Sequence, residues 1–318
     1  MAARTSSSVS DSLATAPAVA RHRSTPTLLF VSLRPEQWTK NLFVFAGLLF
    51  GLRLTDPSAV ALAGATFAIF CALSGAVYLF NDVADRDADQ AHPLKRHRPI
   101  ASRALNVRTA LVAAGLLGVL AIEGALLISR PLALTCGAYL LLLLIYSAAL
   151  KHIVILDVLM IAAGFVLRAV AGAVAVNVPI SHWLLVCTTL LALFLGLSKR
   201  RHELTLLAEG AAGHRPILSE YTPYLLDQMI AVVTASTLIA YVFYATSAET
   251  AGKFGTDRLA WTIPFVLYGI FRYLYLVHQK RGGGSPAAML LTDRPLLACV
   301  ALWAASVMLL LYSPLGRM

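Results

Sequence analysis

Charged residues are scarce in this sequence. Asp, Glu, Lys and Arg together make up 13% of its 318 residues, about half of the roughly 25% that a soluble globular domain carries. Hydrophobic residues make up 58% and are gathered into long runs between polar connections. Apolar runs of this length must face lipid or one another. The sequence therefore predicts an all-α, polytopic membrane helical bundle rather than a soluble domain.

Missing motifs narrow the chemistry further. The chain has no GxSxG, HExxH, Walker A or GxGxxG pattern, so a serine nucleophile, a zinc hydrolase or a dinucleotide site has no support. Its four cysteines, Cys71, Cys136, Cys187 and Cys299, all fall inside apolar runs, and none forms a CxxC pair. We interpret them as small core residues, not as disulfides or zinc ligands.

Nine membrane spans of about twenty residues each are expected from the hydropathy pattern. The first is the most irregular, because Arg34 and Lys40 lie in its early half, and it is expected to begin as an interfacial helix. The nine spans are residues 28–50, 58–79, 107–128, 132–149, 153–176, 181–198, 227–247, 259–278 and 294–313.

Lys and Arg are distributed unevenly between the two ends of these spans. We count 19 on the side of the N-terminal tail and 5 on the other side. Cytoplasmic loops carry the excess of Lys and Arg. The N-terminus is therefore predicted on the cytoplasmic side of a bacterial plasma membrane and the C-terminus on the outer side. Residues 1–25 are interpreted as a disordered cytoplasmic tail and residues 26–318 as one nine-span transmembrane domain. Its connections 80–106, 150–152 and 199–226 are expected to form a cytoplasmic active site.

The strongest chemical signal is an acidic segment directly after the second span. If the helix continues, Asp82, Asp85 and Asp89 share one face, with Asn81 one turn before Asp85. Hard oxygen ligands suit Mg²⁺, which is usually held by one or two carboxylates plus substrate phosphates. A solvated helix cap is the alternative, but acidic residues run against the basic bias expected here. The segment therefore predicts a Mg²⁺ site, with Asp82 and Asp85 as catalytic carboxylates.

Basic residues follow this acidic segment at once, as Lys95, Arg96 and Arg98. Where a metal neutralises some phosphate oxygens, Lys and Arg can neutralise the rest. An ordinary basic loop is the alternative for any one of them, but the paired clusters favour a phosphate-bearing substrate. The expected substrate-binding site is completed by Gln37, Lys40, Asn41, Tyr146, Lys151, Asp157, Arg168, Lys199, Arg200 and Arg201.

Two pairs of polar residues have a defined helical spacing. Asp157 and Arg168 are eleven residues apart in one span, about three turns, so they share a face. Ionisable residues inside a span are functional candidates, with structural pairing to neighbouring helices as the alternative. Lys199 and Glu203 also share a face. We expect Lys199 to be catalytic and Glu203 to complete the metal shell.

Residues 81–89 resemble the NDxxDxxxD motif of the UbiA superfamily of intramembrane prenyltransferases. Nine spans with the N-terminus inside is also the architecture of that family, and the resemblance covers nearly the whole chain. Aromatic prenyltransferases of the family carry a second acidic motif, DxxxD, after the sixth span, which holds a second Mg²⁺ on the prenyl diphosphate. Here that place is taken by Ser-Lys-Arg-Arg-His-Glu at 198–203.

Three segments, 34–41, 92–102 and 198–203, resemble instead the phosphoribosyltransferase branch of the superfamily, which acts in actinobacterial cell-wall synthesis. Arg103 departs from that branch, where glycine is expected. The resemblance implies a membrane phosphoribosyltransferase that uses Mg²⁺, 5-phosphoribosyl 1-diphosphate and polyprenyl (decaprenyl) phosphate. One acidic motif with several cations suits a donor that carries a diphosphate and a separate 5-phosphate.

Two other functions stay open at this point. An aromatic prenyltransferase of the same superfamily is one, and the missing second acidic motif argues against it. A transporter of a phosphorylated metabolite is the other, although transporters place their sites near the midplane between repeats. The net charge of +10 fits basic loops, anionic membrane lipids or an anionic substrate rather than nucleic acid. Prenyl chain length and homo-oligomer formation are left open.

Overall fold

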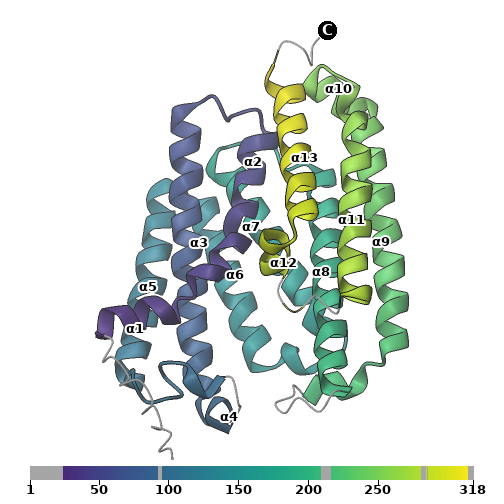
Figure 1. Cartoon of the computed structure of the whole chain (residues 1–318). Helices are drawn as coiled ribbons and strands as arrows, with labels where there is room; N and C mark the ends of the chain where they lie inside the picture. The colour runs from purple at the N-terminus through teal and green to yellow at the C-terminus, as the bar shows by residue number, and fades with distance from the viewer. Residues whose placement is uncertain (1–23, 92–94, 209–215, 281–283, 285, 314–318) are drawn as a thin grey trace, which may run out of the picture.

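A computed structural model describes residues 24–91, 95–208, 216–280, 284 and 286–313, and the part of the chain it describes is built from helices (Figure 1). The predicted tail, residues 1–25, lies almost wholly outside these residues. The elements in order are α1 (Thr25–Ser32), η1 (Pro35–Val44), α2 (Phe45–Phe50), α3 (Pro57–Ala84), α4 (Arg86–Ala91), η2 (Lys95–His97), α5 (Val107–Ile128), α6 (Arg130–Ala148), η3 (Leu150–His152), α7 (Leu156–Ala175), α8 (His182–Ala208), η4 (Pro216–Glu220), α9 (Pro223–Thr246), α10 (Ala248–Phe254), η5 (Arg258–Thr262), α11 (Ile263–Gln279), α12 (Pro286–Thr292) and α13 (Arg294–Tyr312).

Among the described residues, eight helices are long and apolar enough to cross a membrane: α3, α5, α6, α7, α8, α9, α11 with η5, and α13. They match the last eight expected spans, and the predicted polytopic all-α bundle is confirmed. The chain is a multi-pass membrane protein.

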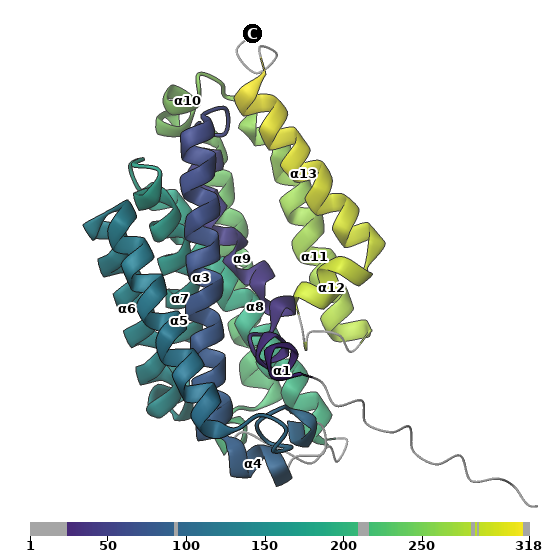
Figure 2. The ribbon, with the colours of Figure 1, turned by 90° about the vertical axis from the view of Figure 1, so that its left-hand side faces the viewer.

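The first expected span, 28–50, is not one of these eight helices, and it is irregular, as Arg34 and Lys40 in its early half led us to expect. It is divided into α1, the 3₁₀ helix η1 and the short helix α2. Arg34, at φ 54°, lies in the left-handed region immediately before Pro35, and a residue before proline is disfavoured in the α conformation. Figure 1 shows α1 crosswise in the lower half of the bundle, above α4, and α2 higher up beside α7, while Figure 2 views α1 along its axis.

This broken segment is held against α7 by contacts that leave no room for a side chain. A Cβ on Gly172 would lie 1.8 Å from the carbonyl oxygen of Val44, and one on Gly47 would lie 2.5 Å from the backbone nitrogen of Ala173. Small residues let helix backbones approach this closely inside membranes. The glycines therefore fix the height of η1, which carries several of the expected substrate-binding residues.

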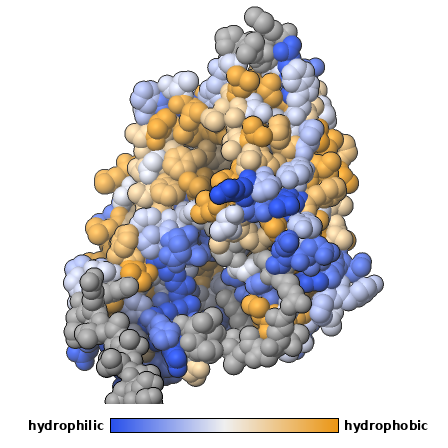
Figure 3. All heavy atoms as spheres, viewed as in Figure 1, coloured by the Kyte–Doolittle hydropathy of each residue, from blue (hydrophilic) through white to orange (hydrophobic). Residues whose placement is uncertain are grey.

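The helices α3 and α8 are longer than a bilayer requires. They have 28 and 27 residues, which is about 40 Å at 1.5 Å per residue, against a hydrocarbon core of about 30 Å. Their C-terminal turns, with the acidic segment on α3 and residues 198–203 on α8, lie toward the same lower end of the bundle as α4 (Figure 1). Figure 3 shows that hydrophilic residues gather on this lower part of the visible face, below a largely hydrophobic upper part.

Candidate active site at the ends of α3 and α8

The acidic segment does not continue as one helix. α3 ends at Ala84, Asp85 is its C-cap with φ −91° and ψ 9°, and α4 begins at Arg86. The turn stays compact, because the Asp85 N–H donates to Asn81 O and the Asp89 N–H to Asp85 O, each at 2.8 Å. The expected single helical face of three carboxylates is therefore interrupted at Asp85, the C-cap of α3.

Asp82 and Asp89 converge on one guanidinium. Nη1 of Arg98 donates to Asp82 Oδ1 at 3.2 Å and to Asp89 Oδ2 at 2.6 Å. Arg34 also pairs with Asp82, and Lys95 lies 4.0 Å from Asp89. Both carboxylates are buried, at 2% and 3% exposure, so each needs such a cation.

This donor set fits a divalent metal with phosphate oxygens. Two buried carboxylates meet at a position that a cation, the Arg98 guanidinium, fills. Mg²⁺ is typically held by one or two carboxylates plus substrate phosphates and waters. No cluster of three or more His, Cys, Asp or Glu side chains occurs among the described residues, so the phosphate oxygens would be an essential part of the site.

Asp85 has a different environment from its two neighbours. Its side chain is 45% exposed and accepts a hydrogen bond from Lys151 Nζ at 3.4 Å, which joins the end of α3 to η3. Asn81 is half-buried at the same end. Arg96 points elsewhere, since its Nε donates to His97 at 3.4 Å on an exposed surface. The half-buried Gln37 lies on η1, with its backbone N–H bonded to Arg34 O at 2.8 Å.

A second charged group joins α7 to α8. The guanidinium of Arg200 donates to Asp157 Oδ2 at 2.7 Å and also pairs with Glu203. Asp157 and Arg200 were expected to bind substrate, but both are almost wholly buried. The pair joins the two helices and is not accessible to a substrate. Tyr146 acts electrostatically on Arg200 from the end of α6.

Tyr221, which was not among the site residues expected from the sequence, completes this group. Its hydroxyl donates to Asp157 Oδ1 at 2.7 Å and accepts from the Ile155 N–H at 2.8 Å. Ile155 has φ 69°, a strained conformation for a β-branched residue. Burial raises the pKa of Tyr221 to about 12, so the phenol stays a neutral donor. No motif marks Tyr221, because its partners lie about 64 residues away in sequence.

The remaining residues of 198–203 divide between two directions. Lys199 Nζ lies 3.9 Å from Glu203 Oε1, as the shared helical face predicts. Arg201 instead donates to Asp227 Oδ1 at 2.6 Å, and His278 also contacts that carboxylate. Arg201 therefore joins α8 to α9, and Asp227 in turn contacts α11 through His278.

Lys40 on η1 lies among other cations. Lys199, Arg168 and Arg34 are the cations that act on its ammonium group, and Glu36 is the opposing charge. Among the described residues, no carboxylate lies within 4.0 Å of Lys40. Like charges at close quarters are unfavourable unless an anion joins them, so this position favours an anionic ligand.

Arg168 lies on α7, is buried, and donates its hydrogen bonds to neutral groups. Its guanidinium donates to Asn41 Oδ1 at 2.7 Å, to Gly164 O at 2.9 Å and to the Tyr139 hydroxyl at 2.6 Å. Ser74 extends the network, at 3.2 Å from the same hydroxyl. Arg168 and Asn41 were expected to bind substrate directly. The structure instead places both in a buried network with Tyr139 and Ser74.

The sequence matches the UbiA prenyltransferase family over residues 41–293. The chain belongs to this family. It is 32% identical over 288 residues to the decaprenyl-phosphate phosphoribosyltransferase of Mycolicibacterium smegmatis, covering 88% of this chain and 91% of that protein. It is 33% identical over 282 residues to the enzyme of the same name from Mycobacterium tuberculosis, with 87% and 91% covered.

The fold agrees with solved UbiA structures. A UbiA homologue from Archaeoglobus fulgidus, bound to GPP and Mg²⁺, superimposes with a TM-score of 0.68 at 19% identity, covering 88% of this chain and 98% of that one. The protein is thus a UbiA-family membrane transferase. Its candidate site is formed by the acidic segment of α3 and α4 and by the basic residues of η1 and α8.

Proposed function

We propose that this UbiA-family protein transfers 5-phosphoribose from 5-phosphoribosyl 1-diphosphate to a polyprenyl phosphate, with decaprenyl phosphate as the natural candidate. The observation that carries the proposal is the unequal division of charge in the site. One side has the converging carboxylates Asp82 and Asp89. The other has Lys40 on η1 and, acting on it, Lys199, which lies in the 198–203 segment where a second acidic motif would be needed for a prenyl diphosphate. The relatives named decaprenyl-phosphate phosphoribosyltransferase support the same reaction.

The acidic side is assigned to the diphosphate of the donor. Asp82, Asp85 and Asp89, with Asn81, would hold Mg²⁺ there, and the ion would stabilise negative charge on the leaving diphosphate. Arg98 and Lys95 are within reach of the same carboxylates and would contact phosphate oxygens. The more distant 5-phosphate is assigned to Lys40 and Lys199.

The bonding changes need no strong general base. A phosphate monoester has a second pKa near 6, so an oxygen of the lipid phosphate is already ionised at neutral pH. That oxygen forms a bond to ribose C1 while the C1–O bond to the diphosphate breaks, and the bonding electrons leave with the diphosphate. Attack from the opposite face would invert the anomeric centre. We assign no residue as a base.

The decisive assay uses the purified protein in detergent or nanodiscs. It is incubated with Mg²⁺, radiolabelled 5-phosphoribosyl 1-diphosphate and decaprenyl phosphate, and a labelled lipid is expected. A parallel incubation with geranyl diphosphate and 4-hydroxybenzoate tests the aromatic prenyltransferase reaction. Prenylated product in the second assay, with no labelled lipid in the first, would refute the proposed reaction.

The proposal also places the candidate site at the cytoplasmic face of a bacterial plasma membrane. The excess of Lys and Arg near α4 and the end of α8 supports this orientation. An alkaline phosphatase fused after Met318 is expected to be active, because this enzyme folds only outside the cytoplasm. An inactive fusion beside an active cytoplasmic reporter at the same point would reverse the orientation.

A further inference from the structure

Arg98 joins the two buried carboxylates of the acidic segment through a single nitrogen atom. Its Nη1 donates to Asp82 Oδ1 at 3.2 Å and to Asp89 Oδ2 at 2.6 Å. Both carboxylates are almost wholly buried, whereas the Arg98 side chain is 28% exposed. The guanidinium therefore covers the carboxylate pair and is itself in contact with solvent.

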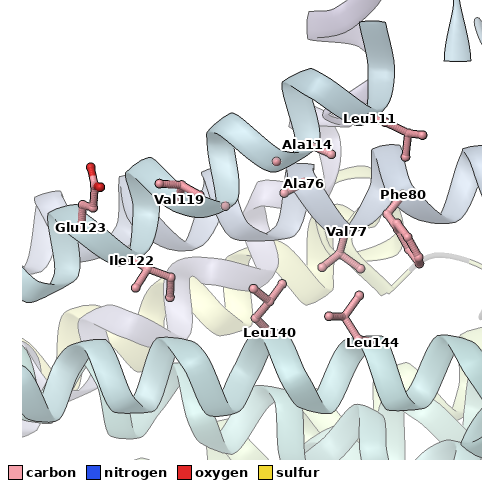
Figure 4. A pocket seen from close by; sticks show the side chains of 12 residues that line it. Ala76, Val77, Phe80, Leu111, Ala114, Val119, Ile122, Glu123, Leu140 and Leu144 are labelled. Carbon is pink, nitrogen blue, oxygen red and sulfur yellow. The ribbon is translucent and has the colours of Figure 1, made fainter. Parts of the chain in front are cut away.

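The carboxylate of Asp82 is turned away from the apolar outer face of α3. Figure 4 shows Val77 and Phe80 of α3 on this face, among apolar side chains of α5 and α6. Asp82 follows Phe80 by two residues, which is about 200° around a helix. Its cationic partners come from the other side, with Arg34 immediately before η1 and Arg98 immediately after η2. The cations that balance this carboxylate are therefore supplied by the protein itself.

These two arginines differ in how firmly their guanidinium groups are held. The guanidinium of Arg34 pairs with Asp82 and also lies over the ring of Tyr78, 4.7 Å from the ring centroid. A cation–π contact of this kind adds to the ion pair. Among the described residues, no aromatic ring lies against Arg98 in the same way. Of the two, Arg98 is the cation that can leave Asp82 with the smaller loss of contacts.

The backbone that follows Arg98 is firmly anchored. Ile100 and Leu105 are 1% and 2% exposed and pack with Leu79 in one hydrophobic cluster. The Leu105 N–H donates to Pro99 O at 2.9 Å, which closes this part of the connection into a compact turn. An exchange of partners at the carboxylates can therefore take place by rotation of the Arg98 side chain while the backbone stays in position.

We infer that Arg98 and a divalent cation are alternative partners of Asp82 and Asp89, and that the displaced guanidinium moves onto the diphosphate that enters with the metal. The inference rests on the proposed function, in which Mg²⁺ and the donor diphosphate occupy this side of the site. A guanidinium and a divalent ion repel each other, so they do not share the same carboxylate oxygens. Metal alone leaves Arg98 beside a dication with no anionic partner, whereas metal with diphosphate gives both cations a partner. Metal and donor should therefore each raise the affinity for the other.

The two roles of Arg98 give the variant Arg98→Gln opposite effects on two ligands. Binding of Mn²⁺, a paramagnetic substitute for Mg²⁺, to the purified protein in detergent is measured by electron paramagnetic resonance. Binding of radiolabelled 5-phosphoribosyl 1-diphosphate is measured at saturating Mg²⁺. Arg98→Gln should bind Mn²⁺ alone about tenfold more tightly, because the competing cation is gone, and the donor about tenfold more weakly. The control Arg103→Gln removes the same charge from an exposed position of the same connection and should match wild type with both ligands.

A second measurement uses the wild-type chain and so does not depend on the folding of a variant. Phenylglyoxal modifies accessible arginine side chains, and the modified positions are located by peptide mass spectrometry. Saturating Mg²⁺ should speed the modification of Arg98, since the released guanidinium loses its carboxylate partners. Arg103 in the same digest should react at an unchanged rate. Unchanged or slower modification of Arg98 in Mg²⁺ would overturn the inference.

Mn²⁺ affinity that is unchanged or weaker in Arg98→Gln would make Arg98 a fixed support of the carboxylates and would also overturn the inference. An equal gain in Arg103→Gln would do the same, because it would trace the effect to net charge. Tighter Mn²⁺ binding in Arg98→Gln, with no donor binding to either protein, would refute the phosphoribosyl donor while the exchange at Asp82 and Asp89 stands. Unchanged Mn²⁺ affinity in Arg98→Gln, beside a wild-type protein that forms labelled lipid, would refute the exchange alone.

Discussion

Two arginine-centred regions of this protein have opposite electrostatic environments. At the end of α3, Arg98 is surrounded by the carboxylates Asp82 and Asp89. Deeper in the bundle, Arg168 is only 7% exposed and donates to an amide oxygen, a backbone oxygen and a phenol. In the first region a cation is paired with carboxylates, so a metal ion and phosphates could take the place of these partners. In the second region the charge of Arg168 is stabilised by neutral hydrogen-bond acceptors in a buried network.

This difference separates binding from positioning. Where carboxylates and guanidinium groups share a polar surface, Mg²⁺ and phosphates can replace one set of ion pairs by another at modest cost. Every donor nitrogen of Arg168 already has an acceptor, so a substrate would have to break this network to bind it. We therefore assign Arg168 to holding Asn41 on η1, close to Lys40, and the Asp82 region to the chemistry.

Removing the charge of Asp85 should break the first region most severely. Asp85→Asn is expected to lower turnover at least a hundredfold, about 2.7 kcal/mol or more in transition-state stabilisation, with the protein still folded. The side chain is 45% exposed and pairs with Lys151, so the nearly isosteric change removes no buried contact. Turnover is measured as labelled lipid formed, with gel filtration as the check on folding.

A neighbouring aspartate offers a matched control for this variant. The side chain of Asp87 is 90% exposed and pairs with the adjacent Arg86, outside the converging pair. Asp87→Asn should keep wild-type turnover. If both variants lose activity equally, the effect belongs to the net charge of the segment rather than to a metal position.

The sequence was enough to predict the region of Asp82 and Asp89 but not its internal geometry. Hydropathy located the spans, because an apolar stretch of about twenty residues has few other uses. The break at Asp85 could not be predicted, since the residues from Asn81 to Asp89 include neither proline nor glycine. Next to this turn Asp82 pairs with Arg34 and Arg98, which come from other parts of the sequence.

The Arg168 region was predicted less well, for a related physical reason. Helical spacing placed Arg168 on the same face as Asp157, with a functional role and structural pairing to neighbouring helices as the two alternatives. The structure gives them separate partners, Asn41 and Tyr139 for the first and Arg200 and Tyr221 for the second. Partners in a bundle are decided by which helices pack together, and a periodic pattern on one helix carries no information about that.

The basic side of the site should respond in affinity for the donor rather than in turnover. Loss of a charged hydrogen bond costs about 1.5–3 kcal/mol, which is roughly tenfold to a hundredfold in affinity. Lys199→Ala is therefore expected to raise KM for 5-phosphoribosyl 1-diphosphate by such a factor and to change KM for the lipid far less. Steady-state kinetics with each substrate varied in turn provides the measurement.

The outcome also tests how the two phosphate groups are assigned. A selective rise in KM for the polyprenyl phosphate would mean that the lipid phosphate, not the 5-phosphate, occupies the position beside Lys199. Equal changes for both substrates would make the contact between Lys199 and Glu203 a structural one.

In the second region, loss of the guanidinium should act on stability. Arg168→Met keeps most of the side-chain volume but removes the guanidinium donors of Asn41 Oδ1 and the Tyr139 hydroxyl. Ser74 Oγ lies 3.4 Å from the first and 3.2 Å from the second, and its single O–H can donate to only one of them. A buried polar group left unsatisfied costs about 1–3 kcal/mol, and removing a buried charge offsets part of this. We expect a net loss of about 2 kcal/mol in unfolding free energy, measured by chemical denaturation in detergent. Wild-type stability combined with a selective loss of donor binding would return Arg168 to the substrate site.

The smallest effect is expected from a substitution that removes one hydrogen bond and no charge. Tyr139→Phe deletes the hydroxyl that accepts from Arg168 at 2.6 Å and lies 3.2 Å from Ser74. The aromatic ring, which stacks 4.7 Å from the guanidinium carbon, is kept. Because Arg168 retains its bonds to Asn41 and Gly164, the variant should lose only about 0.5–1.5 kcal/mol of stability and keep its donor KM. A rise in donor KM without any loss of stability would mean that the buried network extends functionally to the substrate, and the division between positioning and binding would fail at Tyr139.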